Sequence, residues 1–163
     1  LYLWKTRYLL HFTSDTNLPR NNHFRIEKAL EVFEKRNDIA VANPAWNYNY
    51  KGVQSESFDK VGNFYLGYGF SDQCYLIRTD EFRKPIYNEY HPASDRYPGY
   101  GGELFEKRVD SYMHNHERLR ITSTDCTYIH RNFPKPVNQR RMLRAKIYLL
   151  PISLSMPDKI IKH

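Results

Sequence analysis

The amino-acid sequence predicts an α/β protein in which a mixed sheet is flanked by helices. Two strand-like segments, over residues 6–12 and 38–44, are separated by a segment with helical periodicity, which is typical of strands joined by a crossover helix. A second helical segment, at about 103–116, follows another apolar run at 73–79. The chain has 163 residues, of which 40% are hydrophobic and 15% aromatic, so a single domain with an ordinary core is expected.

The first three elements are expected in the order strand, helix, strand. The first strand, over residues 6–12, is rich in apolar and aromatic side chains. A helix is predicted to begin at Asn21 or Asn22, either of which can cap it, and to reach about Asn37. The run "DIAVANP" then predicts a short strand that Pro44 ends. The apolar face of the helix is predicted to consist of Ile26, Ala29, Leu30 and Phe33.

The middle of the chain carries fewer signals. Residues 45–70 are rich in Asn, Tyr, Gly and Ser and are predicted to form a long loop, which in a compact domain is usually functional or disordered. The run "QCYLIRT" (73–79) is the next expected strand. Prolines and glycines predict another loop over residues 90–102.

The last part of the body is expected to contain one helix and two strands. The helix is predicted from about Glu103 to His116, and the runs "LRIT" (119–122) and "CTYIH" (126–130) are predicted as separate strands. The core face of the helix is predicted to consist of Phe105, Val109, Tyr112 and Met113.

The positive charge is concentrated at the end of the chain. Residues 131–163 contain eight of the 25 Lys and Arg residues and one of the 18 Asp and Glu residues, which accounts for the whole net charge of +7. The chain is therefore divided into a neutral body, residues 1–134, and a basic amphipathic tail, residues 135–163. A neutral body argues against nucleic acid as a partner, because neutralising phosphates requires a basic face. The tail could lie on an anionic membrane surface, or dock on the body, or be disordered.

Two features bear on the location of the protein. No run approaches the roughly 20 apolar residues of a membrane span. Cys74 and Cys126 show no metal-binding or redox spacing and lie in apolar strand-like runs, so buried thiols in a reducing compartment are expected. A cytoplasmic protein, in possible peripheral contact with a membrane through its tail, is the resulting prediction.

An ordered set of motifs gives the sequence a family resemblance. A hydrophobic strand ends at "TSD", the strand "IAVANP" and the segment "FSDQCYLIR" follow, the Gly-rich "GYGGELFEKR" opens a helix, and a strand closes with "YIH". Over residues 6–133 this order resembles the C-terminal half of a GT-A-type, nucleotide-sugar-dependent glycosyltransferase. The chain opens within the apolar segment "LYLW" without Met, so a fragment lacking an N-terminal part is expected.

The resemblance implies a cation site at Asp15. In that family the first strand ends in an Asp-x-Asp motif that holds Mn²⁺ or Mg²⁺ on the donor diphosphate, and only the last acid is present in Thr13-Ser14-Asp15. Hard cations of this kind need few protein carboxylates when phosphate oxygens and waters complete the shell. The alternative is that Asp15 merely forms an Asx-turn at a strand end.

The resemblance also implies a second ligand, His130, at the end of a late strand. A neutral imidazole can bind the cation if another group orients its second nitrogen. The neighbouring Arg131 would contact donor phosphate. A structural His and a solvated Arg are the alternatives.

The catalytic base implied by the resemblance is Glu103. It would accept the proton of an acceptor hydroxyl, and Gly101 and Gly102 before it would allow the backbone to approach substrate closely. Leu104 occupies the position where the family often has Asp. The alternative for Glu103 is a carboxylate that merely favours the first turn of a helix.

Three further residues are expected at the substrate. Asp72 precedes the strand that in this family often borders the acceptor, and it could hydrogen-bond sugar hydroxyls. Trp46 and Tyr48 could stack on sugar faces, or they could simply close a loop over the core. The implied partners are a nucleotide-sugar donor and a glycan or lipid-linked acceptor. The rival function is a non-catalytic carbohydrate-binding or interaction module.

Overall fold

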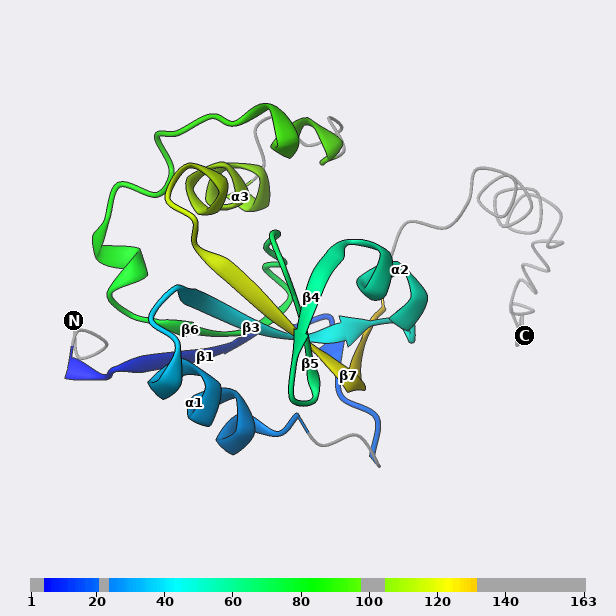
Figure 1. Ribbon diagram of the computed structural model, residues 1–163. Helices are drawn as coiled ribbons and strands as arrows, with labels where there is room; N and C mark the ends of the chain where they lie inside the picture. The colour runs from blue at the N-terminus through cyan, green and yellow to red at the C-terminus, as the bar shows by residue number, and fades with distance from the viewer. Residues whose placement is uncertain (1–4, 21–23, 98–104, 132–163) are drawn as a thin grey trace, which may run out of the picture. The chain divides into compact units, whose positions relative to one another are not determined.

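A computed structural model describes residues 5–20, 24–97 and 105–131, which form an open mixed sheet with helices on both faces (Figure 1). The predicted α/β class is confirmed. The elements follow in the order β1 (Tyr8–Phe12), β2 (Thr16–Asn17), α1 (Ile26–Lys35), β3 (Ile39–Trp46), α2 (Tyr50–Ser55), β4 (Ser57–Val61), β5 (Phe64–Gly67), β6 (Cys74–Arg78), the 3₁₀ helices η2 (Glu81–Arg83) and η3 (Pro92–Arg96), α3 (Phe105–Asn115) and β7 (Leu119–His130). The predicted tail, residues 135–163, lies outside the described residues.

The strand order brings several strand ends to one edge of the sheet. The order is β1-β6-β3-β7-β5-β4, and β2 pairs with β7 beside this path. β3 and β7 are parallel, whereas β1 and β3 both pair with β6 in the antiparallel sense. The strands β1, β3 and β7 therefore end at the same edge, and β6 begins there.

The two faces of the sheet carry separate apolar cores. Ala42 of β3 belongs to the core under α1, and its neighbour Val41 belongs to the core under α3, as the alternation of side chains along a strand requires. Figure 1 shows the two helices on opposite sides of the sheet. Both predicted helix faces are confirmed: Ala29 and Phe33 of α1 are fully buried, and Val109, Tyr112 and Met113 of α3 are also buried.

The start of α1 differs from the prediction. The helix begins at Ile26, and Arg25 stands at the N-cap position without a side-chain capping bond. Asn21 and Asn22, the predicted caps, lie outside the described residues. Burial of the apolar face thus marks this helix more clearly than its cap does.

The prediction of a long loop over residues 45–70 is wrong. The segment contains α2, β4 and β5, and the two strands form a hairpin in which Val61 pairs with Phe64 across Gly62-Asn63. Gly62 has a φ of 56°, the left-handed region that a tight hairpin turn needs. The Gly-Asn pair was a readable hairpin signal, but β4 is too short and too exposed to show a periodic pattern.

The two strands predicted over 119–122 and 126–130 are one strand, β7. Its pairing with β3 jumps from Asn43–Thr122 to Ala45–Thr127, so the intervening residues bulge out of the ladder. Ser123 stabilises the bulge, because its Oγ accepts a hydrogen bond from the Cys126 amide at 3.0 Å. The polar break in the sequence therefore marks a bulge.

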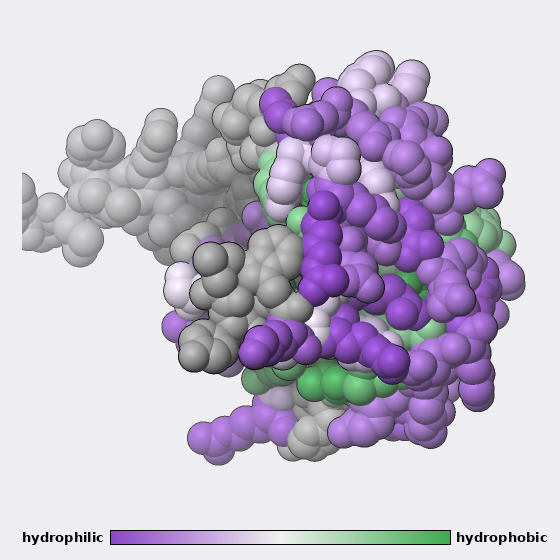
Figure 2. All heavy atoms as spheres, turned by 90° about the vertical axis from the view of Figure 1, so that its left-hand side faces the viewer, coloured by the Kyte–Doolittle hydropathy of each residue, from purple (hydrophilic) through white to green (hydrophobic). Residues whose placement is uncertain are grey.

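Two large apolar side chains of the edge strand β1 are exposed. Leu10 and Phe12 of this edge strand are 38% and 42% exposed. On the side of the molecule shown in Figure 2, hydrophilic side chains predominate, and hydrophobic ones appear as a strip low on this face and as smaller separate patches. None of the helices in the described part of the chain has the length and apolar character needed to cross a bilayer.

Candidate functional site

Four of the residues predicted from the sequence lie at the sheet edge where β1, β3 and β7 end. Asp15 follows β1, Trp46 is the last residue of β3, and His130 is the last residue of β7. Asp72 lies just before β6, which begins at the same edge. Parallel strand ends in open α/β sheets are a common place for ligands, so this edge is the candidate site.

Asp15 and His130 are in direct contact although 115 residues separate them in the sequence. His130 Nε2 lies 2.8 Å from Asp15 Oδ2, and the two side chains are 18% and 27% exposed. The short ladder between β2 and β7 holds them together, because Thr16 pairs with His130 and the Arg131 amide donates to the Asp15 carbonyl at 3.1 Å. The side chain of Arg131, the predicted phosphate contact, is exposed.

A line of short contacts leads from Asp15 to Asp72. Thr13 Oγ1 lies 2.8 Å from Asp15 Oδ1 and 2.8 Å from Gln73 Oε1. At the other end of the same amide, Gln73 Nε2 donates to Asp72 Oδ1 at 2.8 Å. A turn positions Thr13, since the Thr16 amide donates to the Thr13 carbonyl at 3.1 Å.

Glu106, in the first turn of α3, extends this line to a third carboxyl group. Its Oε1 accepts a hydrogen bond from the Asp72 amide at 3.0 Å. Burial, together with the nearby Asp72 carboxyl, raises the pKa of Glu106 to about 7, against hydrogen bonds from the Asp72 amide and Ser71 that lower it. No Lys, Arg or His of the described residues forms an ion pair with Glu106. Its neighbours on α3 do form ion pairs, Lys107 with Asp95 and Asp110 with Arg96.

Hydrogen bonds from β3 and β7 hold the residues on either side of Asp72, Ser71 and Cys74, in place. Buried Asn43 of β3 donates from Nδ2 to the Cys74 carbonyl at 2.7 Å. The hydroxyls of Ser71 and Tyr128 lie 3.0 Å apart, and burial raises the pKa of Tyr128 above its ordinary value. We call Thr13, Asp15, Asp72, Gln73, Glu106 and His130 the polar edge.

A comparison of the chain with protein-family models, with curated proteins and with solved structures found no match.

The donor atoms of Asp15 and His130 fit a shared divalent cation. Two adjacent ligands at about 2.1 Å in an octahedral shell lie about 3 Å apart, which is close to the spacing of Asp15 Oδ2 and His130 Nε2. No group of three or more His, Cys, Asp or Glu residues that could enclose a metal occurs among residues 5–20, 24–97 and 105–131. The pair would thus supply part of a coordination shell and leave the rest to ligand oxygens and water.

The aromatic residues predicted at the substrate border the same edge. Tyr48 is 58% exposed and has a φ of 59°, and its amide donates to Thr127 Oγ1 at 3.0 Å. Asn47 accepts a hydrogen bond from the His130 amide at 3.0 Å, so the turn carrying Tyr48 is tied to the end of β7. Trp46 is partly buried and pairs with Tyr128 in the ladder. An exposed ring on a backbone held this firmly is suited to stacking on a ligand.

The predicted base and its glycines cannot be compared with the structure, because Gly101, Gly102 and Glu103 lie outside the described residues. Glu106 is the site residue that sequence reasoning missed. It lies one position after the core residue Phe105 and looks like any acidic residue in a first helical turn. Its contact with Asp72 joins residues 34 positions apart, which no local pattern shows.

Two hollows in the described part of the chain lie away from the polar edge. One, of about 340 Å³, is beside α3 and includes Tyr87 and Tyr90 in its lining. The other, of about 440 Å³, lies between α1 and the β4–β5 hairpin and is lined by Lys28 and Phe64 among others.

Proposed function

We propose that this chain is the catalytic part of a GT-A-type glycosyltransferase in the cytoplasm. It transfers a sugar from a nucleoside-diphosphate donor to a hydroxyl group of a glycan or lipid-linked acceptor. The observation that carries the proposal is the 2.8 Å contact between Asp15 and His130, the two residues to which the family resemblance assigns the cation.

Asp15 and His130 hold Mn²⁺ or Mg²⁺ in this proposal, with Arg131 at the phosphates. A divalent cation neutralises the charge that builds on the leaving diphosphate. The guanidinium of Arg131, which is exposed, adds charge-assisted hydrogen bonds to phosphate oxygens.

Glu106 is the proton acceptor that the described residues support best. The oxygen of the acceptor hydroxyl attacks the anomeric carbon, the bond from that carbon to the diphosphate oxygen breaks, and the hydroxyl proton passes to the carboxylate. A base works best when its pKa lies near the working pH, and the pKa of Glu106 is raised to about 7. Glu103, three positions earlier in the sequence, stays the prediction from the sequence, and Asp72 would bind hydroxyls of the acceptor.

One observation favours the rival function, a non-catalytic carbohydrate-binding module. Tyr48 presents an exposed ring at the polar edge, which would serve sugar binding without any chemistry. The two functions differ in whether a cation and a nucleotide are needed.

The first test is binding of nucleoside diphosphates (UDP, GDP, ADP, CDP and dTDP) to the full chain by titration calorimetry, with and without Mn²⁺. We expect one of them to bind only with Mn²⁺. Asp15→Asn should weaken that binding at least about tenfold, because it removes a charged ligand of the cation. Asp59→Asn, at an exposed position of β4, is the matched control and should bind normally.

If none of these nucleotides binds in an Mn²⁺-dependent way, the proposal that the chain is a glycosyltransferase is contradicted. The second measurement is sugar transfer or donor hydrolysis with the nucleotide that binds. Glu106→Gln should lower turnover about 10²–10⁴-fold while the nucleotide still binds. Loss of turnover in Glu103→Gln alone would assign the base to Glu103, and glycan binding that needs neither metal nor nucleotide would establish the rival function.

A further inference from the structure

The turn that follows β3 holds two consecutive residues in the left-handed region. Asn47 and Tyr48 have φ values of 47° and 59°, and the Asn49 amide donates to the Trp46 carbonyl at 2.8 Å. Positive φ at both central residues, closed by this hydrogen bond, is the pattern of a type I′ turn. Such turns favour Asn at the first central position and Gly at the second. Tyr48 therefore stands where the backbone favours Gly.

Hydrogen bonds to β7 fix this backbone, so the turn cannot relax around the tyrosine. The Asn47 amide donates to the Tyr128 carbonyl at 2.8 Å, and the Tyr48 amide donates to Thr127 Oγ1 at 3.0 Å. A bulky side chain is unfavourable in the left-handed region, because its Cβ atom crowds the backbone. Strain of this kind is often found where a side chain has a function, which directs attention to the ring.

The ring of Tyr48 has an open face. Tyr48 is 58% exposed, and within residues 5–20, 24–97 and 105–131 no other ring stacks on it and its hydroxyl forms no hydrogen bond. Tyr68 and Tyr75 differ in this respect, because each stacks on a histidine ring. The ring of Tyr48 thus contributes little to the fold and is available to a ligand.

Two amide side chains flank Tyr48 in the sequence, and the oxygen atom of each is already engaged. Asn47 Oδ1 accepts a hydrogen bond from the His130 amide at 3.0 Å, and Asn49 Oδ1 accepts one from the Gly52 amide at 3.1 Å. Each side chain is left with its Nδ2 group, which only donates. An Asn that reads the edge of a nucleobase uses its donor and its acceptor together. Donors beside a ring suit the hydroxyl oxygens of a sugar.

We propose that the turn 46–49 is a sugar-binding subsite and that Tyr48 is its specificity-determining residue. The ring stacks on the C–H-rich face of a pyranose, while Asn47 and Asn49 donate to its hydroxyl oxygens. The hydrogen bond from the His130 amide to Asn47 places this subsite next to the polar edge. Naming the sugar as that of the acceptor rests on the proposed function, whereas the stacking on Tyr48 does not.

The first experiment follows the ring resonances of Tyr48 in the full chain by NMR, with Tyr48→Phe to assign them. The probes are the methyl pyranosides of glucose, galactose, mannose and N-acetylglucosamine. We expect at least one of them to shift these resonances without metal or nucleotide, and the nucleosides uridine, guanosine and adenosine to leave them unchanged. A shift with nucleosides alone would overturn the proposal, as would no shift with any glycoside in the presence or absence of Mn²⁺ and UDP.

Tyr48→Ala and Tyr48→Gly separate the ring from the backbone strain. Both remove the ring, so the affinity for the glycoside, followed through the His130 amide, should fall at least about fivefold in each. Only Gly also relieves the strain, so Tyr48→Gly should melt about 2–4 °C above Tyr48→Ala. Tyr48→Phe keeps the stacking face and should bind the glycoside normally. Unchanged affinity in Tyr48→Ala, or equal melting of the Ala and Gly variants, would contradict the proposal.

Glu117 offers a matched control for the strain. It is exposed, has a φ of 50°, and precedes β7, at the opposite end of that strand from His130. The Arg118 amide donates to the Met113 carbonyl at 2.8 Å, a helix-ending bond that favours Gly at Glu117. Glu117→Gly should accordingly melt above Glu117→Ala, and both should bind the glycoside like the unmodified chain. Weaker binding in these two variants would show that altered stability, and not the ring, sets the affinity.

Nucleotide binding and sugar transfer distinguish failure of the subsite from failure of the enzyme. If glycosides bind at Tyr48 while no nucleotide binds with Mn²⁺, the proposed enzyme fails and the subsite stands. If the chain transfers sugar and Tyr48→Ala leaves the KM for the acceptor unchanged, the subsite fails and the enzyme stands. We expect that KM to rise at least about fivefold in Tyr48→Ala and to return to its original value in Tyr48→Phe.

Discussion

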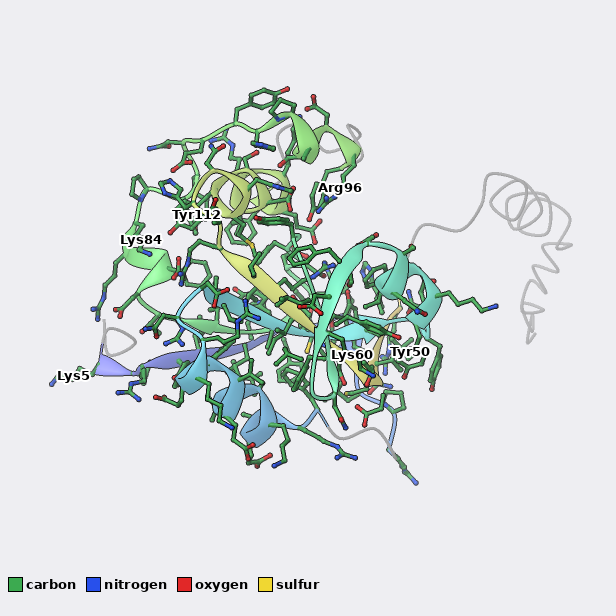
Figure 3. All side chains as sticks on the ribbon, in the orientation of Figure 1. Lys5, Tyr50, Lys60, Lys84, Arg96 and Tyr112 are labelled. Atoms are coloured by element: carbon green, nitrogen blue, oxygen red, sulfur yellow. The ribbon has the colours of Figure 1, made fainter. Side chains whose placement is uncertain are left out.

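A carboxyl group is buried near each end of α3, Glu81 of η2 near its last turn and Glu106 in its first turn, and the pKa values of the two are shifted in opposite directions. Near the end of the helix, Glu81 is only 3% exposed, and its carboxylate accepts a hydrogen bond from Tyr112 and forms ion pairs with Arg118 and Lys84. Burial pushes the pKa of Glu81 up, but Arg118, Tyr112 and Lys84 together bring it below its ordinary value. Figure 3 shows the side chains of Lys84 and Tyr112 close together at this end, where the ammonium lies 5.8 Å from the ring centre.

At the start of the helix, Glu106 has another carboxyl group as its neighbour. Burial and the Asp72 carboxyl both raise its pKa, and two hydrogen bonds only partly offset them. Desolvation acts in the same direction at both ends, so the charge of the neighbours decides the outcome. Glu81 is a fixed anion that stabilises the fold, whereas Glu106 exchanges a proton near neutral pH, which is the property expected of a functional group.

The largest expected loss of stability comes from removing the charge of Glu81, which tests one side of this contrast. Glu81→Gln removes the charge and leaves the mostly buried Arg118 without its anion, so near neutral pH it should destabilise the protein by about 3–5 kcal/mol. Urea denaturation measures the change in the free energy of unfolding. The folded-state pKa of Glu81 is lowered, so its contribution exists above its unfolded pKa and is lost as the pH falls. The penalty should accordingly shrink in acid, and a loss that is independent of pH would contradict the assignment.

The matched change at the other end should act with the opposite sign. The folded-state pKa of Glu106 is raised to about 7. The stability linked to its proton is therefore fully present below the unfolded pKa and is lost as the pH rises through the folded-state pKa of about 7. Glu106→Gln keeps an acceptor for the Asp72 amide and offers a donor to the Asp72 carboxyl. It should stabilise the protein by about 1–3 kcal/mol at about pH 8 and change little at about pH 4. Equal effects at the two pH values would show that Glu106 is an ordinary carboxylate.

The smallest effect would sharpen the comparison by separating the two cations at Glu81. The Lys84 side chain is 46% exposed and that of Arg118 is 17% exposed. Lys84→Met should therefore destabilise the protein by less than about 1 kcal/mol, as for most exposed ion pairs. Arg118→Met is the comparison and should destabilise the protein more, since it leaves the buried carboxylate of Glu81 with Lys84 as its single cationic partner among the described residues. A larger loss for Lys84→Met would reverse the assignment.

Most of the fold could be predicted where a segment buries one face over several residues. The periodic faces of α1 and α3 and the apolar runs of β1, β3 and β6 all identified their elements. The predicted end of β3 at Pro44 is wrong, because the strand continues to Trp46. The segment 45–70 escaped prediction because β4 is mostly exposed and α2 has only six residues, too few for a period to show. The bulge of β7 was not predicted for a related reason. A polar interruption in an apolar run does not show whether the strand ends there or continues to pair beyond it.

The candidate site divides in the same way. The order of motifs pointed to Asp15 and His130, because both stand where an apolar strand ends, and the structure brings them together. No local pattern pointed to Glu106, since the carboxyl group and amide of its partner Asp72 come from a different part of the chain.

By itself the sequence determined the strands and helices that bury one face over several residues and which polar side chains stand at their ends, because these follow from short-range periodicity and turn chemistry. The tertiary structure alone decided which of those side chains meet and which carboxyl group keeps a proton. The physical reason is that pKa values and hydrogen-bond directions depend on distance, desolvation and the charge of the nearest neighbour. At the polar edge those neighbours come from the segment after β1, the segment before β6, the end of β7 and the start of α3, which only folding brings within a few ångströms of one another.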